Sequence, residues 1–275
     1  MKKCVALLVS ASLCACAQET SKSGEVPVVE EDSLSFDGAD YADEAGKLAH
    51  GERVASMMGC RGCHGAELQG GQTGVGVTFD APNLSLLLPD YSEIELEKAL
   101  RGGVARDGRA LWSIMPSAMY SNLSPADYEA LVAYVRSFPP GGEAQPAFDP
   151  ASMKRIASLD VIKKAPAEVM HARESGGPLS LGNATAKGRY IATTSCTECH
   201  GAQLEGFEGF SPNLDIAGSI ERGKLERLLT DGTGISRPDL GLMSVMGKFR
   251  FSQLTEAERE ALVDYLLARA DANTQ

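Results

Sequence analysis

Apolar residues recur at helical spacing near the end of each half of the chain. The stretches "LSPADYEALVAYV" (123–135) and "LTEAEREALVDYL" (254–266) both place apolar side chains three and four positions apart. Each stretch also opens with a helix-start signal. Ser124 is a favoured N-cap, and Thr255 with Glu258 forms a capping box. The pattern therefore predicts two matching helices.

A second amphipathic helix precedes each of these. Its apolar positions include Leu100 in the first copy and Leu229 in the second, and glycines follow both. Strand-like alternation is nearly absent. We therefore predict an all-α protein with two tandem domains, residues 45–138 and 183–272. Three or four short helices make only a thin core, so something else must fill the middle of each domain.

Three segments lack the helical pattern. Residues 1–15 read as a signal peptide, because Lys2 and Lys3 precede an apolar run far shorter than the roughly 20 residues that span a membrane. Residues 16–44 are polar and acidic, which predicts a flexible tether. Residues 139–182 are rich in proline and glycine and predict a linker with one short helix inside it.

Two processing signals overlap at the end of the apolar run. "LCAC" (13–16) resembles the lipobox of bacterial lipoproteins and would put a lipid on Cys16, while Ala15-Cys16-Ala17 also fits an ordinary cleavage site. We favour the lipoprotein, because Cys16 otherwise has no role. The expected location is the periplasm, at a bacterial membrane.

Charge narrows the choice of partner. The chain has 26 Lys and Arg against 37 Asp and Glu, a formal net charge of −11. This balance argues against nucleic acid, because phosphate binding needs clustered basic residues. It suits docking to a protein with a basic surface.

Two copies of Cys-x-x-Cys-His carry the candidate chemistry. They are "CRGCH" at 60–64 and "CTECH" at 196–200, each followed by Gly-Ala-x-Leu-x-Gly. In an exported protein this spacing is typical of covalent c-type haem attachment, which would also supply the missing apolar body. We predict two haem groups c, with thioether bonds from Cys60, Cys63, Cys196 and Cys199 and iron ligation by His64 and His200.

Two other uses of the cysteines fit less well. A thioredoxin-type site expects alternating strands and helices, and a four-cysteine zinc site expects pairs roughly 15–20 residues apart. Both would leave the two histidines unexplained.

A methionine stands at the same offset before the last helix of each copy. These residues, Met115 and Met246, are the candidates for the second iron ligand, with Met119 and Met243 as local rivals. Met115 is followed by a proline and Met246 by a glycine, so the second assignment is less constrained.

Two further histidines and the tryptophan are expected to have roles other than iron ligation. His50 and His171 fall outside the repeated offsets, which favours surface or packing roles over iron ligation. Trp112 is expected to pack near the first haem.

Both domains resemble class I c-type cytochromes, in particular dihaem cytochromes and the cytochrome subunits of periplasmic dehydrogenases. The resemblance rests on the two Cys-x-x-Cys-His motifs, on Pro-Asn-Leu at 82–84 and 212–214, and on the stretches from Met115 and Met246 into the last helices. It implies that the carbonyls of Pro82 and Pro212 accept a hydrogen bond from the ligating histidine. The first copy departs from the second by a glycine-rich insertion before Pro82.

The expected function is electron transfer between a dehydrogenase or respiratory complex and another redox partner, with no catalytic residue. The alternative is a haem enzyme with one open iron, like a dihaem peroxidase or a thiosulfate-oxidising cytochrome. Nothing in the sequence specifically favours a third possibility, a redox-sensing module. Iron coordination distinguishes the carrier from the enzyme, because a carrier has both axial positions of each iron filled by protein ligands.

Overall fold

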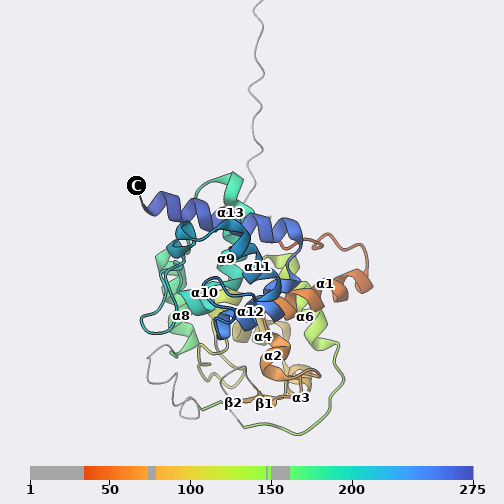
Figure 1. Cartoon of the computed structure of the whole chain (residues 1–275). Coiled ribbons are helices and arrows are strands. Elements are labelled where there is room, and N and C mark those ends of the chain that lie inside the picture. The colour runs from red at the N-terminus through yellow and green to blue at the C-terminus, as the bar shows by residue number, and fades with distance from the viewer. Residues whose placement is uncertain (1–33, 74–78, 147, 150–161, 275) are drawn as a thin grey trace, which may run out of the picture.

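The computed structural model describes residues 34–73, 79–146, 148–149 and 162–274, which form a mostly helical protein (Figure 1). This confirms the all-α prediction. Among the described residues the strands form one antiparallel ladder, β1 (Gly71–Thr73) with β2 (Phe79–Ala81), at the predicted glycine-rich insertion. The predicted signal peptide, Cys16 and the tether up to residue 33 lie outside the described residues.

In the first domain the first and last helices pack against each other. These are α1 (Glu44–Met57) and α6 (Pro125–Arg136). The elements between them are short: α2 (Cys60–His64), α3 (Leu84–Leu87), the 3-10 turn η2 (Leu88–Asp90), α4 (Glu93–Gly102) and α5 (Ser117–Tyr120).

The second domain repeats this plan. Its first and last helices, α9 (Ala186–Ser195) and α13 (Glu256–Asn273), pack against each other. A 3-10 turn, η4 (Asn183–Thr185), precedes α9. Between the two helices lie α10 (Thr197–His200), η5 (Leu214–Ser219), α11 (Arg222–Asp231), α12 (Leu242–Phe249) and η6 (Phe251–Gln253).

The helix-end signals of the sequence act as predicted. The Ser124 side chain accepts a hydrogen bond from the backbone N–H of Asp127 (3.1 Å), and Thr255 and Glu258 form a complete capping box. At the other ends, α4 and α11 stop at glycines in the left-handed region, where a side chain would be strained.

Glycine sets how closely the paired helices approach. A Cβ added to Gly51 in α1 would lie 2.0 Å from the Ala130 carbonyl oxygen of α6. A Cβ on Gly188 in α9 would lie 2.0 Å from the Ala261 carbonyl oxygen of α13. Both helix pairs therefore cross at a point where only glycine fits, at equivalent positions in the two domains.

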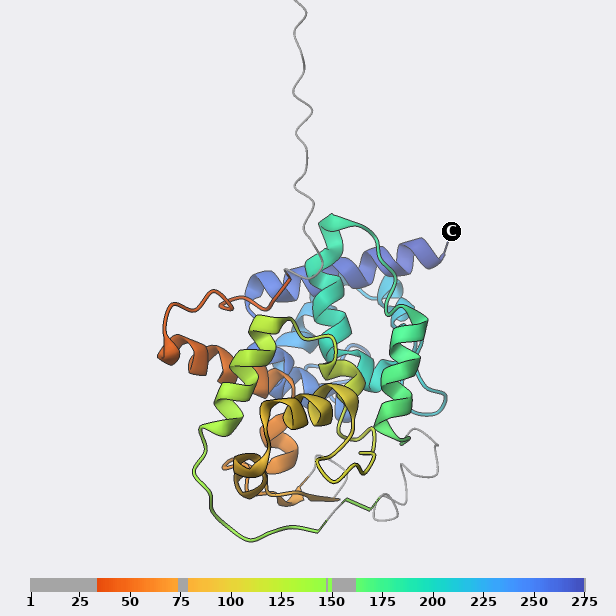
Figure 2. The ribbon, with the colours of Figure 1, turned by 180° about the vertical axis from the view of Figure 1, so that it is seen from behind.

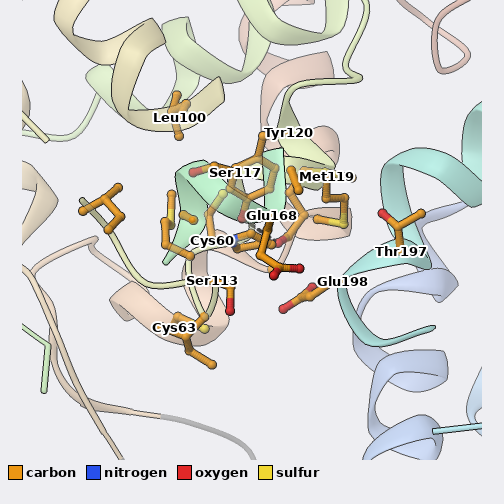
Figure 3. A pocket seen from close by; sticks show the side chains of 18 of the residues that line it. Cys60, Cys63, Leu100, Ser113, Ser117, Met119, Tyr120, Glu168, Thr197 and Glu198 are labelled. Atoms are coloured by element: carbon orange, nitrogen blue, oxygen red, sulfur yellow. Dashed lines mark hydrogen bonds between the residues drawn. The ribbon is translucent and has the colours of Figure 1, made fainter. Parts of the chain in front are cut away.

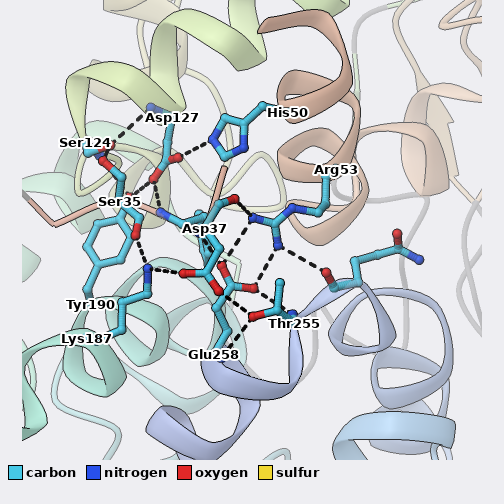
Figure 4. A network of polar contacts seen from close by, with 12 residues as sticks. Ser35, Asp37, His50, Arg53, Ser124, Asp127, Lys187, Tyr190, Thr255 and Glu258 are labelled. Atoms are coloured by element: carbon cyan, nitrogen blue, oxygen red, sulfur yellow. Dashed lines mark hydrogen bonds and ion pairs between the residues drawn. The ribbon is translucent and has the colours of Figure 1, made fainter. Parts of the chain in front are cut away.

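Residues 34–37 differ from the expected tether, because they pack between the two domains. Phe36 is 1% exposed and its ring meets that of Tyr190 edge-on, with centroids 5.3 Å apart. Its backbone N–H donates to Asp127 of the first domain (2.9 Å), and the next N–H donates to Glu258 of the second (2.7 Å). Figure 4 shows this polar network. One buried aromatic residue in an acidic segment has no period, so sequence pattern could not detect it.

The predicted linker contains a helix, α8 (Ala165–Ser175), which packs against α5 and α4 of the first domain (green in Figure 2). Next to its start, the Lys164 ammonium lies 3.5 Å from the centre of the Trp112 ring. This part of the linker is therefore tied to the first domain. In the part of the chain that the structure describes, every helix is too short or too polar to cross a membrane.

Candidate functional site

Both Cys-x-x-Cys-His motifs form a single helical turn directly after the first helix of their domain. In α2, residues three apart lie on one face, so Cys60 and Cys63 project to the same side of the turn. The same spacing in the second motif relates Cys196 and Cys199. None of these four cysteines is in a disulfide. Each pair is therefore available for two bonds to one edge of a planar group.

The thiols lie in apolar surroundings. Burial raises the pKa of all four, to about 12 for Cys60 and Cys199 and to about 11 for Cys63 and Cys196. A redox dithiol or a zinc site needs thiolates, which a low pKa favours. Among the described residues, no group of three or more His, Cys, Asp and Glu side chains could hold a metal ion. The raised pKa of the thiols argues against a thioredoxin-type redox dithiol.

The motif histidines are held by proline carbonyls. His64 Nδ1 lies 2.9 Å from the carbonyl oxygen of Pro82, and His200 Nδ1 lies 2.8 Å from that of Pro212. A carbonyl only accepts, so Nδ1 carries the proton in each ring and Nε2 keeps a free lone pair. Burial lowers the pKa of both histidines, although the hydrogen bond to proline raises it in part. Neutral rings with one oriented nitrogen are suited to bind a metal.

The Gly-Ala-x-Leu-x-Gly sequence after each motif builds the turn that brings the proline back. The backbone N–H of Gly70 donates to the His64 carbonyl (2.8 Å), and that of Gly206 donates to the His200 carbonyl (2.7 Å). Both glycines have positive φ, and a Cβ on Gly70 would lie 2.4 Å from the Ala81 carbonyl oxygen. The repeated glycine is therefore required for the close contact between this turn and the proline segment.

A buried leucine completes this turn. Leu68 and Leu204 are fully buried and have positive φ, which is unusual for a residue other than glycine. Their carbonyls accept hydrogen bonds from the N–H groups of Leu84 (2.8 Å) and Leu214 (2.9 Å), next to each proline. The backbone hydrogen bonds of this repeated turn thus hold the proline carbonyl next to the histidine ring.

A cavity of about 1060 Å³ opens beside the first motif and extends to the second domain. Its walls are mainly apolar and include Leu96 and Leu100 of α4 and Leu131 of α6, all in the first domain. Figure 3 shows Cys60 and Cys63 on one side of it, and Glu198 reaching in from the second domain. The predicted site residues on its wall are Cys60, Cys63, His64, Pro82 and Met115 of the first domain and Cys199 and Met246 of the second.

Three predicted residues lie elsewhere. Cys196 and His200 are less than a tenth exposed and are not on the wall of this cavity, and Pro212 lies behind His200. The first domain fits a haem directly, with two thiols, an oriented imidazole and a methionine around one apolar space. The second domain has the same attachment turn, and its Cys199 and Met246 line the part of the cavity that reaches into this domain.

The four candidate methionines differ in whether they line the cavity. Met115 lies on the cavity wall just before α5, and its neighbour Met119 is 1% exposed on the same wall. Met246 lies on the wall from α12, whereas Met243 packs against the core and does not line the cavity. The geometry therefore supports Met246 over Met243 as the candidate ligand, and Met115 remains the candidate in the first domain.

The remaining candidates have packing or surface positions. His50 is buried and its Nε2 lies 2.6 Å from Asp127 Oδ1, away from the cavity. His171 is an exposed residue of α8 at the cavity. Trp112 lies on the cavity wall, where the sequence predicted that it packs near the haem.

Sequence reasoning missed Arg250 and Glu198, an ion pair of 2.7 Å at the cavity between the domains. A signal was present. Arg250 stands at the offset that Met119 has in the first copy, so a charged residue replaces an apolar one in an otherwise repeated segment. Comparing the two copies position by position would have identified it.

Comparison with known proteins gives the same organisation. The family model "Cytochrome c" matches residues 48–139 and 185–269. A dihaem cytochrome c-type protein of Cereibacter sphaeroides is 26% identical over 269 residues, covering 82% of this chain and 87% of that protein. The fructose dehydrogenase cytochrome subunit of Gluconobacter japonicus is 27% identical over 262 residues, covering 80% of this chain and 52% of the subunit.

A shorter match has a higher sequence identity. A nicotinate dehydrogenase subunit of Pseudomonas putida is 33% identical over 115 residues, which is 38% of this chain and 10% of the relative. The chain thus spans about a tenth of this relative and about half of the fructose dehydrogenase cytochrome subunit.

Proposed function

The chain belongs to the cytochrome c family, and on this basis we propose that it is a two-haem electron carrier between a dehydrogenase and a second redox partner. It has two covalently bound haem c groups, one per domain, and its role is electron transfer. Bound haem supplies an iron that changes between the ferric and ferrous states.

One observation carries the proposal: the attachment turn occurs twice, with the same histidine–proline hydrogen bond, at 2.9 Å and 2.8 Å. In each domain the two thiols would hold one edge of the ring. The proline carbonyl fixes the imidazole plane and keeps Nε2 directed away from the backbone. Because the hydrogen bond to proline sets the orientation of the imidazole before the iron changes its charge, little rearrangement of the protein accompanies electron transfer.

The apolar walls and the methionines support a closed site. Met115 and Met246 line the cavity and would each supply a second protein ligand to the iron of their domain. Leu96, Leu100 and Leu131 line the same cavity and would help to exclude water from the first iron. A site filled on both sides leaves no position for substrate, which favours a carrier over a haem enzyme.

The proposed partner and location draw on the sequence and the relatives. A dehydrogenase would deliver electrons, and the net charge of −11 suits a partner with a basic docking surface. The proposed location is the periplasm, with the protein anchored through a lipid on Cys16.

The test is the absorbance spectrum of the ferric holoprotein with and without azide, together with a haem count. Two low-spin haems that do not respond to azide, with the weak sulfur-to-iron band present, are the expected result. An azide-responsive fraction near half would instead identify one open iron and contradict the carrier function.

A further inference from the structure

Arg250 reaches from the second domain into the space between the two attachment motifs. Its Nε donates to the carbonyl oxygen of Met57, at the end of α1 in the first domain (2.6 Å). Its Nη1 donates to Glu198 Oε2 (2.7 Å) and lies 3.6 Å from the sulfur of Met246. The side chain is only 11% exposed. One buried cation therefore contacts the candidate iron ligand of the second domain and the backbone of the first.

The first domain leaves room for this side chain. Gly59, directly before Cys60, has φ +76°, and a Cβ there would lie 3.3 Å from Arg250 Nε. The guanidinium thus passes over the residue that leads into the first attachment turn. Its position is determined from both domains, by the Met57 carbonyl on one side and Glu198 on the other.

Arg250 keeps its positive charge in this position. A guanidinium is always protonated in proteins, and here it forms an ion pair with the Glu198 carboxylate at 2.7 Å. Glu198 is more exposed than Arg250, at 24% against 11%, so water screens the carboxylate more than the guanidinium. The positive charge near the Met246 sulfur is therefore only partly neutralised.

The first domain has no equivalent charge at this position. The residue that corresponds to Arg250 in the repeat is Met119, a buried apolar side chain beside Met115. A thioether cannot donate a hydrogen bond to another sulfur. The two candidate iron ligands thus have different neighbours, although their histidines are held in the same way.

We propose that the Arg250 guanidinium, by donating to the Met246 sulfur, raises the reduction potential of the second-domain haem above that of the first. A hydrogen bond to the sulfur withdraws electron density that would stabilise ferric iron. The guanidinium also lies beside the first attachment turn, so its positive charge favours the reduced state in both domains. The difference between the domains therefore comes from the hydrogen bond that Arg250 donates to the Met246 sulfur. Electrons that enter at the first domain then pass to the second, one at a time and without a proton. This inference rests on the proposed function, in which both irons are closed by methionine.

The experiment is a potentiometric titration of the holoprotein labelled with ¹³C at its methionine methyl groups and followed by NMR. The signals of Met115 and Met246 report the redox state of their own domains and are assigned with the Met115→Leu and Met246→Leu variants. Met243→Leu checks that this residue is not the ligand. In the unsubstituted protein, the Met246 signal is expected to reach its ferrous position at the higher potential.

Three variants test the role of Arg250. In Arg250→Met, which copies the first domain, the midpoint potential reported by the Met246 signal is expected to fall towards the one reported by the Met115 signal. In Glu198→Gln, the uncompensated guanidinium raises the Met246 midpoint further. The matched control is Arg53→Met, which removes another arginine that joins the domains but does not touch Met246, and it leaves the difference between the midpoints unchanged. Arg250→Gln serves in place of Arg250→Met if the latter does not fold.

Two results would overturn the inference: a lower midpoint at Met246 than at Met115, or an unchanged difference in both neutral Arg250 variants. Both can occur while azide leaves both irons closed. Failure of this ordering is therefore distinguishable from failure of the proposed carrier function, which the azide spectrum tests alone.

Discussion

Arg53 of the first domain donates a hydrogen bond of 2.8 Å to the carboxylate of Glu258 in the second (Figure 4). The second domain returns an equivalent contact, since the hydroxyl of Tyr190 donates to the carboxylate of Asp127 in the first (2.5 Å). Both carboxylates lie in the first turn of the last helix of their domain. Both donors stand two residues after the glycine where the paired helices cross. The domains are therefore joined by two repeat-related contacts, which fixes how the two haem sites face each other.

Removing one of these contacts should destabilise the protein. Arg53→Met leaves the fully buried carboxylate of Glu258 without its cation, and we expect the free energy of unfolding to fall by about 2 kcal/mol. Guanidinium unfolding of the holoprotein measures this. The control is Arg222→Met, which breaks an exposed ion pair with Asp264 and should cost under about 1 kcal/mol. Equal losses in the two variants would contradict a special role for the Arg53 contact.

The turn that holds the proline should not tolerate a side chain at its glycine. In Gly70→Ala the new Cβ would lie 2.4 Å from the Ala81 carbonyl oxygen, so the Pro82 carbonyl must move away from His64. We expect a lower haem content and a shifted potential in the first domain. Gly71→Ala is the control, because Gly71 also has positive φ but no atom lies within 4 Å of its Cβ position. If both variants behave alike, backbone strain and not the clash is responsible.

Met246→Ala should open the second iron. Without the thioether, azide should bind to about half of the haem, and the potential of that haem should fall, because methionine ligation raises it. Absorbance spectra and potentiometry give both readouts. Met243→Ala is expected to leave them unchanged, since Met243 does not line the cavity. The reverse pattern would reassign the ligand to Met243.

Tyr265 should make the second domain sensitive to alkali. Its hydroxyl donates to the Leu179 carbonyl (2.9 Å), and burial raises its pKa from 10.0 to about 12. Because the folded-state pKa is the higher one, the stabilisation is complete below pH 10 and is lost as the pH rises towards 12. Tyr265→Phe should be less stable at pH 8 by about 1 kcal/mol, through the lost hydrogen bond. The difference should shrink or reverse by pH 12, as measured by guanidinium unfolding across this range. A constant difference would count against the raised pKa.

Cys16 should decide whether the protein stays with the membrane. If the lipobox is used, Cys16→Ser moves the protein from the membrane fraction to the soluble periplasmic fraction, while the haem content stays the same. Cell fractionation and mass spectrometry of the N-terminus test this. An unchanged distribution with an unmodified N-terminus would favour the ordinary cleavage site at Ala15-Cys16-Ala17.

The sequence by itself determined the attachment chemistry and the helices that carry it. The thiols and histidine of each site occupy five consecutive residues, so one helical turn places them and no distant contact is needed. The capping signals at Ser124 and Thr255 are equally local, and both helices begin where these residues predict. Because each of these features occurs twice in the sequence, the repeat alone predicted the two-domain organisation.

Only the tertiary structure decided how the two copies differ and how they meet. Phe36 is buried, and Arg250 bridges the domains, because each contacts residues far away in the sequence. Such contacts depend on how the packed helices bring distant surfaces together, and periodicity and spacing describe only neighbours along the chain. The ordering of the two haems proposed here therefore depends on a side chain whose partners become adjacent only after folding.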